Sequence, residues 1–282
     1  MSNQLLGIIY GLASAAIWGS GDFSGGFATK KDNVFTVVFL SQFFGLLLLI
    51  LLAVLFADPT PTTRDLFFGA LAGLGGMVGL LGFYYGLSQQ QMGLFAPLVA
   101  VITAILPVFA GILFEGLPSM VQIIGFCIAF TAVWFLSLGG EKNQITPKVI
   151  WLAITAGLGF STFFIAIDQA DGSGAVFWPL VAARTASVVV LSVILAVRRL
   201  PHTAPRQNLP VIGLTGIFDS GGNIFFVLAA QVGRLDIASV LGSLYPATTV
   251  MLAWLILKER LQRMQWIGVG LTLVALLLIA GS

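Results

Sequence analysis

The chain has 282 residues, of which 58% are hydrophobic and 9% are charged, and its mean hydropathy is +1.03. A soluble domain carries about a quarter charged residues, so this composition excludes a water-covered globule and indicates a polytopic membrane protein in a lipid bilayer. The net charge of +2 and the lack of a long basic run exclude nucleic acid as an expected partner. Because Cys127 is the single cysteine, an internal disulfide and a cysteine-based metal cage are also excluded.

A bilayer core about 30 Å thick requires about 20 apolar residues per helix. Short polar or Pro/Gly-marked breaks divide the chain into ten segments of this kind. The first is expected to be a retained helix, because no basic residue precedes it and its apolar run exceeds that of a signal peptide. The predicted fold is therefore all-α, with transmembrane helices at about residues 5–28, 34–57, 66–87, 93–114, 119–138, 148–168, 175–197, 209–231, 236–257 and 262–281.

The basic residues of the predicted loops predict the orientation of the chain. Only Arg64 and Arg234 follow even-numbered segments. Because cytoplasmic loops are enriched in lysine and arginine, the odd-numbered loops are expected in the cytoplasm and both termini outside. The ten basic residues that follow odd-numbered segments are Lys30, Lys31, Lys142, Lys148, Arg198, Arg199, Arg206, Lys258, Arg260 and Arg263.

The two halves of the sequence resemble each other. Gly11-Leu12 and Asp22 recur at the same spacing as Gly157-Leu158 and Asp168, and Gln122-Ile123-Ile124-Gly125 recurs as Gln265-Trp266-Ile267-Gly268. Five helices are an odd number, so a second copy must lie upside down relative to the first. The expected organisation is two inverted five-helix repeats, residues 1–140 and 141–282, as in many secondary transporters. The similar composition of all apolar helices is the alternative explanation.

Particular motifs resemble those of the EamA family, within the drug/metabolite transporter superfamily. The run Ala238 to Val250, with Glu259-Arg260-Leu261 and Gln265 to Gly268, resembles its C-terminal repeat. Trp18-Gly19-Ser20 and Ala96-Pro97 resemble its N-terminal repeat, although Gly116 stands where a basic residue would follow Glu115. The resemblance implies a ten-helix carrier in the inner or plasma membrane that exports amino acids, metabolites or drugs. It also implies cytoplasmic termini, in conflict with the charge distribution.

Four ionisable side chains lie inside the predicted helices, where each costs about 2.5–3.5 kcal/mol on insertion scales. Arg184 and Asp219 lie near the middles of consecutive helices, so an ion pair is plausible. Asp22 lies among glycines and serines, which favours a carboxylate in a polar cavity over a helix end turned toward Lys30. Asp168 is close to the end of its helix and is expected at the water interface.

Burial disfavours the charged form of a carboxylate, so a buried aspartate can bind and release a proton near neutral pH. Our hypothesis assigns proton coupling to Asp22, with Asp219 as the second candidate and Arg184–Asp219 as a fixed pair. Arg184 could instead hold a carboxylate or phosphate of the substrate. Its counterpart in the first repeat is Gln42, a neutral hydrogen-bonding side chain and a second substrate-binding candidate.

Prolines mark candidate helix interruptions at corresponding places in the two halves. Pro97 lies in the fourth segment and Pro246 in the ninth. Interrupted segments at such places indicate a carrier's binding site, so the substrate is expected near Ala96–Leu98 and Ser243–Pro246. Aromatic residues that could line that site are Trp18, Tyr84, Tyr85 and Tyr245.

The predicted function is secondary transport of a small molecule by alternating access, as a monomer or dimer, with proton coupling as one option. An uncoupled carrier or exchanger remains open, and a channel or a membrane-embedded enzyme is the rival from another class. The sequence shows one histidine, in a basic loop, and no nucleotide-binding motif, so no catalytic site, metal or cofactor is expected. The glycine run from Gly69 to Gly86 in the third segment predicts close helix contact.

Overall fold

The computed structural model describes residues 3–88, 92–137, 147–257 and 262–280. These residues form α-helices and contain no strand, so the all-α prediction is confirmed. Of the described helices, six are long and apolar enough to cross a membrane: residues 34–55, 63–88, 98–115, 147–168, 177–198 and 209–232. The helices are α1 (Asn3–Thr29), α2 (Val34–Leu55), α3 (Thr63–Ser88), α4 (Met92–Glu115), α5 (Met120–Ser137), α6 (Pro147–Asp168), α7 (Phe177–Arg198), α8 (Leu209–Val232), α9 (Leu235–Gly242), α10 (Tyr245–Leu257) and α11 (Arg263–Ala280).

The ninth predicted segment is two helices rather than one. Its first part, α9, ends at Gly242, and α10 begins at Tyr245 after a turn at Ser243 and Leu244. Pro246 has no backbone N–H to donate, which favours a break just before it. The fourth segment differs, because α4 continues through both Pro97 and Pro107. The expectation of matching interruptions in the two halves is therefore wrong for the first half.

Polar side chains at the helix ends fix where several helices begin. Asn33 is the N-cap of α2, and its side chain accepts a hydrogen bond of 2.9 Å from the backbone N–H of Phe35. Asp58, after the end of α2, accepts from three backbone N–H groups at the start of α7, at 2.9–3.0 Å. A carboxylate at this position satisfies donors that the helix cannot satisfy and complements its dipole.

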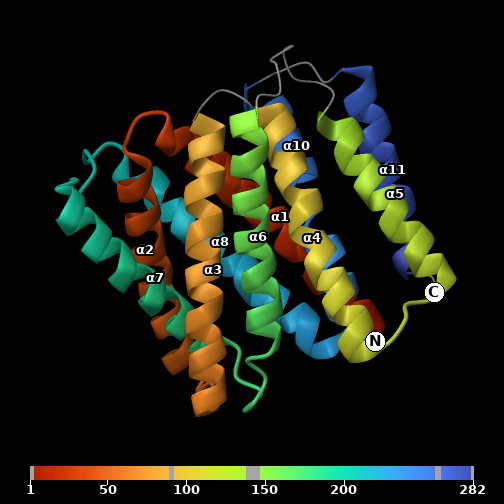
Figure 1. The fold of residues 1–282 in the computed structure, drawn as a ribbon, viewed down its shortest axis with the longest axis horizontal. Coiled ribbons are helices and arrows are strands. Elements are labelled where there is room, and N and C mark those ends of the chain that lie inside the picture. The colour runs from red at the N-terminus through yellow and green to blue at the C-terminus, as the bar shows by residue number, and fades with distance from the viewer. Residues whose placement is uncertain (1–2, 89–91, 138–146, 258–261, 281–282) are drawn as a thin grey trace.

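Helices from the two halves of the chain pack against each other in matching pairs (Figure 1). The first helix of one half contacts the third of the other, as α1 with α8 and α6 with α3. The second helices, α2 and α7, contact each other, and so do the last, α5 and α11. This reciprocal pattern is what two related units produce when they pack face to face.

Close contact between α3 and its partners depends on glycine. A Cβ atom on Gly73 would overlap the backbone carbonyl of Ala183 in α7, and one on Gly159 in α6 would lie 2.5 Å from the nitrogen of Gly79. Without side chains at these positions the backbones can approach closely, which is a recurrent device of helix packing in lipid. The close contact predicted from the glycine run is confirmed.

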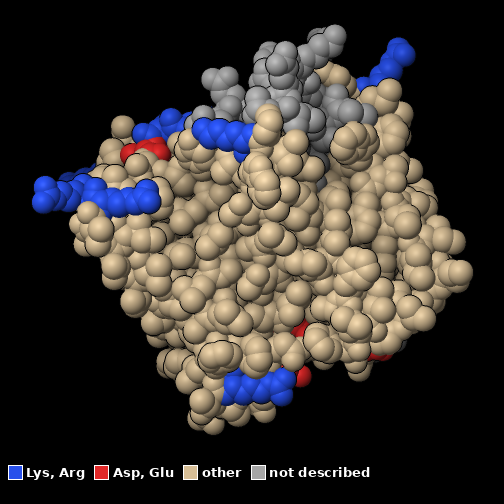
Figure 2. Space-filling model, viewed as in Figure 1, with Lys and Arg blue, Asp and Glu red and all other residues tan. Residues whose placement is uncertain are grey.

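Charged residues gather at the two ends of the bundle. Figure 2 shows Lys and Arg along the upper edge, where α1 and α7 end and α6, α8 and α11 begin, and few charges between the two ends. The described basic residues there are Lys30, Lys31, Lys148, Arg198, Arg199, Arg206 and Arg263. We call this end of the bundle the basic end. The opposite end of the bundle, where both chain termini lie, is called the acidic end. Lys142, Lys258 and the Glu259-Arg260-Leu261 motif lie outside the described residues.

Candidate functional site

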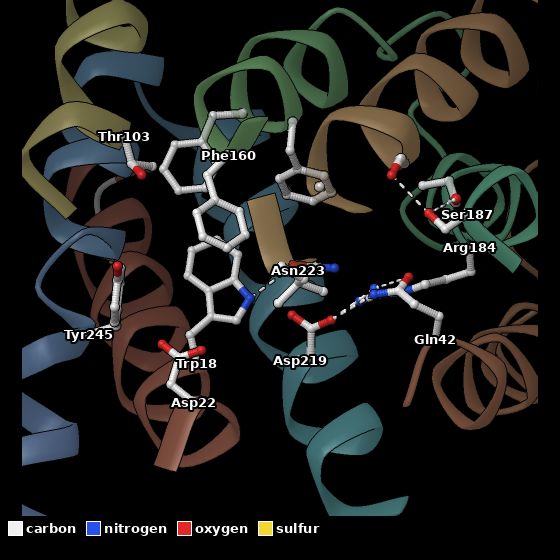
Figure 3. Close-up of a pocket in the computed structure, with 16 residues that line it drawn as sticks. Trp18, Asp22, Gln42, Thr103, Phe160, Arg184, Ser187, Asp219, Asn223 and Tyr245 are labelled. Carbon is white, nitrogen blue, oxygen red and sulfur yellow. Dashed lines mark hydrogen bonds and ion pairs between the residues drawn. The ribbon is translucent and has the colours of Figure 1, made fainter. Parts of the chain in front are cut away.

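A small cavity of about 50 Å³ lies in the middle of the bundle, between the two halves of the chain. Figure 3 shows side chains from both halves converging on it. A single water needs about 10–15 Å³ measured this way, so the cavity holds only a few waters in this conformation. Its lining residues are Trp18, Asp22, Gln42, Gly73, Gly76, Leu80, Thr103, Phe160, Phe163, Phe164, Ala183, Arg184, Ser187, Asp219, Asn223 and Tyr245.

An ion pair between Arg184 of α7 and Asp219 of α8 forms one wall of the cavity. Nη1 of Arg184 lies 2.8 Å from Oδ2 of Asp219, and the same nitrogen donates to Oε1 of Gln42 in α2. Gln42 Nε2 also lies 3.4 Å from Oδ2 of Asp219. The side chains of Arg184 and Asp219 are 6% and 14% exposed, so the pair is largely shielded from solvent. Nη2 of Arg184 is buried without a hydrogen-bond partner in the described residues.

The contact between Gln42 and Arg184 joins two positions that the sequence repeat treats as equivalent. They lie on α2 and α7, which are the second helices of the two halves and pack against each other. The ion pair therefore lies where helices of the two halves meet.

Asp22 of α1 reaches the same cavity but lacks a counter-ion. It lies within α1 rather than at its end, one residue after Gly21, where a Cβ would be 3.3 Å from the backbone nitrogen of Asp219. Within the described residues, no hydrogen bond or ion pair joins the Asp22 carboxylate to another side chain. The cavity thus brings together three of the four ionisable residues singled out from the sequence, one basic and two acidic.

Trp18 forms a rigid wall one helical turn before Asp22. Its indole N–H donates to Oδ1 of Asn223 at 2.9 Å, and its ring stacks on Phe164 with centroids 5.4 Å apart. A Cβ on Gly222 would overlap the indole, so α8 leaves a slot that the ring fills. Rotation of Trp18 would break both the hydrogen bond and the stacking.

Tyr245, at the start of α10, is the aromatic residue that connects the cavity with the broken ninth segment. Its hydroxyl donates to the carbonyl of Ala96 in α4 at 3.3 Å, so the two segments expected to flank the substrate do contact each other. Pro246 is buried but does not line the cavity, and Pro97 lies within α4 with a side chain outside the described part. From α4, the cavity is lined instead by Thr103, whose buried hydroxyl has no hydrogen-bond partner among the residues that the structure describes.

The remaining expected aromatic residues do not line this cavity. Tyr84 is 1% exposed and packs its ring on Gly25, while Tyr85 is 37% exposed and turns away. In their place, α6 contributes three phenylalanines that were not predicted: Phe160, Phe163 and Phe164. Asn223 was also missed, although it lies one helical turn after Asp219 and so on the same face.

Asp168, the counterpart of Asp22 in the repeat, lies far along α6 at the acidic end. Its carboxylate accepts a hydrogen bond of 3.1 Å from its neighbour Gln169, and it borders a separate small pocket with Asp171. The expected position near the helix end agrees with this placement. Asp22 and Asp168 are equivalent in the sequence repeat, but of the two only Asp22 lines the central cavity.

A polar contact network joins the two halves at the acidic end. Glu115, the last residue of α4, accepts from the backbone N–H of Leu235 at 3.0 Å, at the start of α9. Arg234 donates to the carbonyl of Gly116 at 2.7 Å and forms an ion pair of 2.8 Å with the fully buried Asp236. Hydrogen bonding to Asp236 raises the pKa of Arg234, so the guanidinium remains charged. We call Glu115, Gly116, Arg234, Leu235 and Asp236 the α4–α9 latch.

The described residues contain no group of three or more His, Cys, Asp or Glu placed to hold a metal ion. The EamA-like transporter family matches the chain twice, over residues 5–138 and 147–281. The chain belongs to this family. The two matches coincide with the two sets of helices that pack against each other, and an EamA-like transporter is a membrane protein with several spanning helices.

A crystal structure of another protein has the same fold as this EamA-like chain, with a TM-score of 0.75. Sequence identity is 14%, and the match covers 96% of this chain and 95% of the other. At this identity, the likeness shows a shared fold alone. The comparison with curated proteins found no match.

Proposed function

We propose that this EamA-like protein is a secondary transporter that moves a small molecule out of the cell through the central cavity. Ten membrane-spanning segments in two inverted repeats would surround that cavity, with α9 and α10 together as one span. The observation that carries the proposal is the placement of Asp22, Arg184 and Asp219 around one cavity between the halves. Charged groups at membrane depth are costly and typically mark the path of a substrate or ion.

Alternating access needs a site that opens to one side and then to the other. The cavity in this conformation is too small for a metabolite, so binding requires the surrounding helices to separate. The α4–α9 latch joins the halves at the acidic end and would open in one of the two states. The break between α9 and α10, next to Tyr245, supplies a place where that motion could bend the ninth segment.

Proton coupling is the second part of the proposal. The charges of Arg184 and Asp219 compensate each other, whereas Asp22 has no ion-pair partner among the described residues and can take up a proton to lose its charge. Asp22 interacts electrostatically with Asp219, Tyr84 and Tyr245. Proton binding at Asp22 would then alternate with substrate binding, which links export to a proton gradient.

The proposed function is tested by growth of cells that overexpress the protein, on a panel of toxic amino acids, amines, organic acids and nucleobase analogues. Resistance to one class, with lower accumulation of that labelled compound in the cells, is the expected result. The test variant is Asp22→Asn, which should abolish the resistance. Asp171→Asn is its matched control, because Asp171 is an exposed carboxylate outside the cavity. No change in accumulation of any compound on the panel would contradict export.

A further inference from the structure

The cavity is lined by one more acidic side chain than basic ones. Among the described lining residues, the acidic side chains are Asp22 and Asp219 and the basic one is Arg184, so the cavity has one excess negative charge whenever both carboxylates are ionised. Arg184 is committed to Asp219 at 2.8 Å and to Gln42, so its charge is already compensated. Asp22 has no ionic partner in the part of the chain that the structure describes, and an ionised carboxylate in an apolar interior is costly unless a proton or another cation joins it.

The walls near Asp22 are aromatic rather than basic. Trp18 and Phe164 line the cavity and are stacked with centroids 5.4 Å apart. Phe226, which does not line the cavity, stacks on Phe164 with centroids 4.2 Å apart. Trp18 and Asp22 both line the cavity from α1, one helical turn apart and so on the same face of that helix (Figure 3). Aromatic faces attract ammonium groups, and tryptophan attracts them most strongly. A carboxylate next to fixed aromatic rings is a recognition surface for an organic cation.

An anionic substrate would meet a less favourable arrangement. The Nη1 atom of Arg184 already serves Asp219 and Gln42, and an anion at the free Nη2 would share the cavity with two carboxylates. Adding a negative charge would leave the site with two uncompensated charges, whereas adding a monocation makes it neutral. The buried Nη2 remains available for a neutral acceptor such as a carbonyl or hydroxyl oxygen.

From this geometry we infer that the transported substrate is an organic monocation, with its ammonium group bound to Asp22 and its apolar body packed against Trp18 and Phe164. The inference rests on the proposed transport function and specifies the substrate class of the same cavity. The ring positions are fixed by the Trp18–Asn223 hydrogen bond of 2.9 Å and by the Gly222 slot. A flat or aromatic amine fits this surface better than a highly branched one.

The test compares four ligands of nearly equal shape: 2-phenylethylamine, 2-phenylethanol, 3-phenylpropionate and phenylalanine. Their binding to the purified full-length protein in lipid nanodiscs is measured by calorimetry at neutral pH. The amine is expected to bind at least about tenfold more tightly than the neutral alcohol, a difference of about 1.4 kcal/mol. Asp22→Asn should remove that difference, and Asp171→Asn should leave it unchanged.

Two further measurements separate the possible outcomes. A thermal unfolding midpoint for Asp22→Asn that matches the unaltered protein shows that the variant is folded, and the Trp18→Leu variant should also weaken amine binding. Tighter binding of 3-phenylpropionate or phenylalanine that depends on Arg184, equal binding of amine and alcohol, or binding of none of the four would overturn the cation assignment. Saturable flux of an anion or zwitterion in proteoliposomes would still support a carrier, whereas failure of all flux would contradict the proposed function itself.

Discussion

Arg184 and Asp219, on consecutive helices α7 and α8, form an ion pair of 2.8 Å inside the bundle. Arg184 is the one cationic side chain among the described lining residues of the cavity. Because it pairs with Asp219, no described lining residue can form an ion pair with Asp22. This division of charge, a fixed pair beside a free carboxylate, is the basis of both the coupling and the substrate proposals.

The first prediction concerns the stability of the pair. Arg184→Gln leaves Asp219 buried without a cation, and breaking a buried pair from one side costs about 3–5 kcal/mol. The double variant Arg184→Gln/Asp219→Asn has no unpaired charge and should recover most of that loss. Thermal unfolding of the detergent-purified variants measures both effects. A double variant no more stable than Arg184→Gln would argue against this ion pair.

A second prediction concerns the slot for Trp18. Gly222→Ala places a methyl group against the indole, so the ring must leave Asn223 or Phe164. We expect a loss of stability of about 1–3 kcal/mol, typical of overpacking, and weaker substrate binding. Gly270→Ala is the matched control, because a Cβ there meets no atom within 4 Å. Equal unfolding midpoints for the two variants would show that the slot does not constrain Trp18.

The α4–α9 latch gives a third prediction. In a Cys127→Ser background, Thr103→Cys places a thiol in the cavity, and a membrane-impermeant maleimide reports access from the acidic end. Glu115→Ala removes the acceptor for Leu235 N–H and should raise the labelling rate about fivefold to tenfold, the equivalent of roughly 1–1.4 kcal/mol. Asp171→Ala is the control at the same end. A labelling rate that Glu115→Ala does not change would show that the latch is not a gate.

Orientation in the membrane is the fourth prediction. Described basic residues gather at one end of the bundle and both termini lie at the other. Lysine and arginine favour the cytoplasmic side, so alkaline phosphatase fused after Ser282 should be active and a green fluorescent protein fusion dark. The reverse result would place the acidic end in the cytoplasm, as the family resemblance implies.

Much of the fold could be predicted because lipid imposes a simple rule on sequence. Apolar runs of about 20 residues separated by short polar breaks identify helices without any tertiary information, and the boundaries of α2 and α7 agree with the expected segments within two residues. The break at Ser243 and Leu244 lies next to Pro246, where the sequence predicted an interruption. Proline indicates a weak point, but tertiary packing decides whether the helix breaks, as α4 shows by continuing through Pro97.

The charged part of the cavity could be predicted for the same reason. Ionic groups such as Asp22, Arg184 and Asp219 are rare inside apolar helices, so the sequence alone identifies each of them as a candidate site residue. The aromatic wall could not be predicted, because Phe160 and Phe164 resemble the other phenylalanines of the chain and only the packing of α6 against α3 and α4 brings them to the cavity. Asn223 could have been found from its place one turn after Asp219.

Transport by reconstituted protein tests the central claim most directly. Proteoliposomes with an imposed pH gradient are loaded with the compound that the growth panel identifies, and initial flux is compared for the unaltered protein, Asp22→Asn and Asp171→Asn. The account predicts saturable, gradient-driven flux that Asp22→Asn reduces at least about tenfold, while Asp171→Asn retains it. Gradient-driven flux that is equal in all three proteins would contradict a role for the central carboxylate in the transport path.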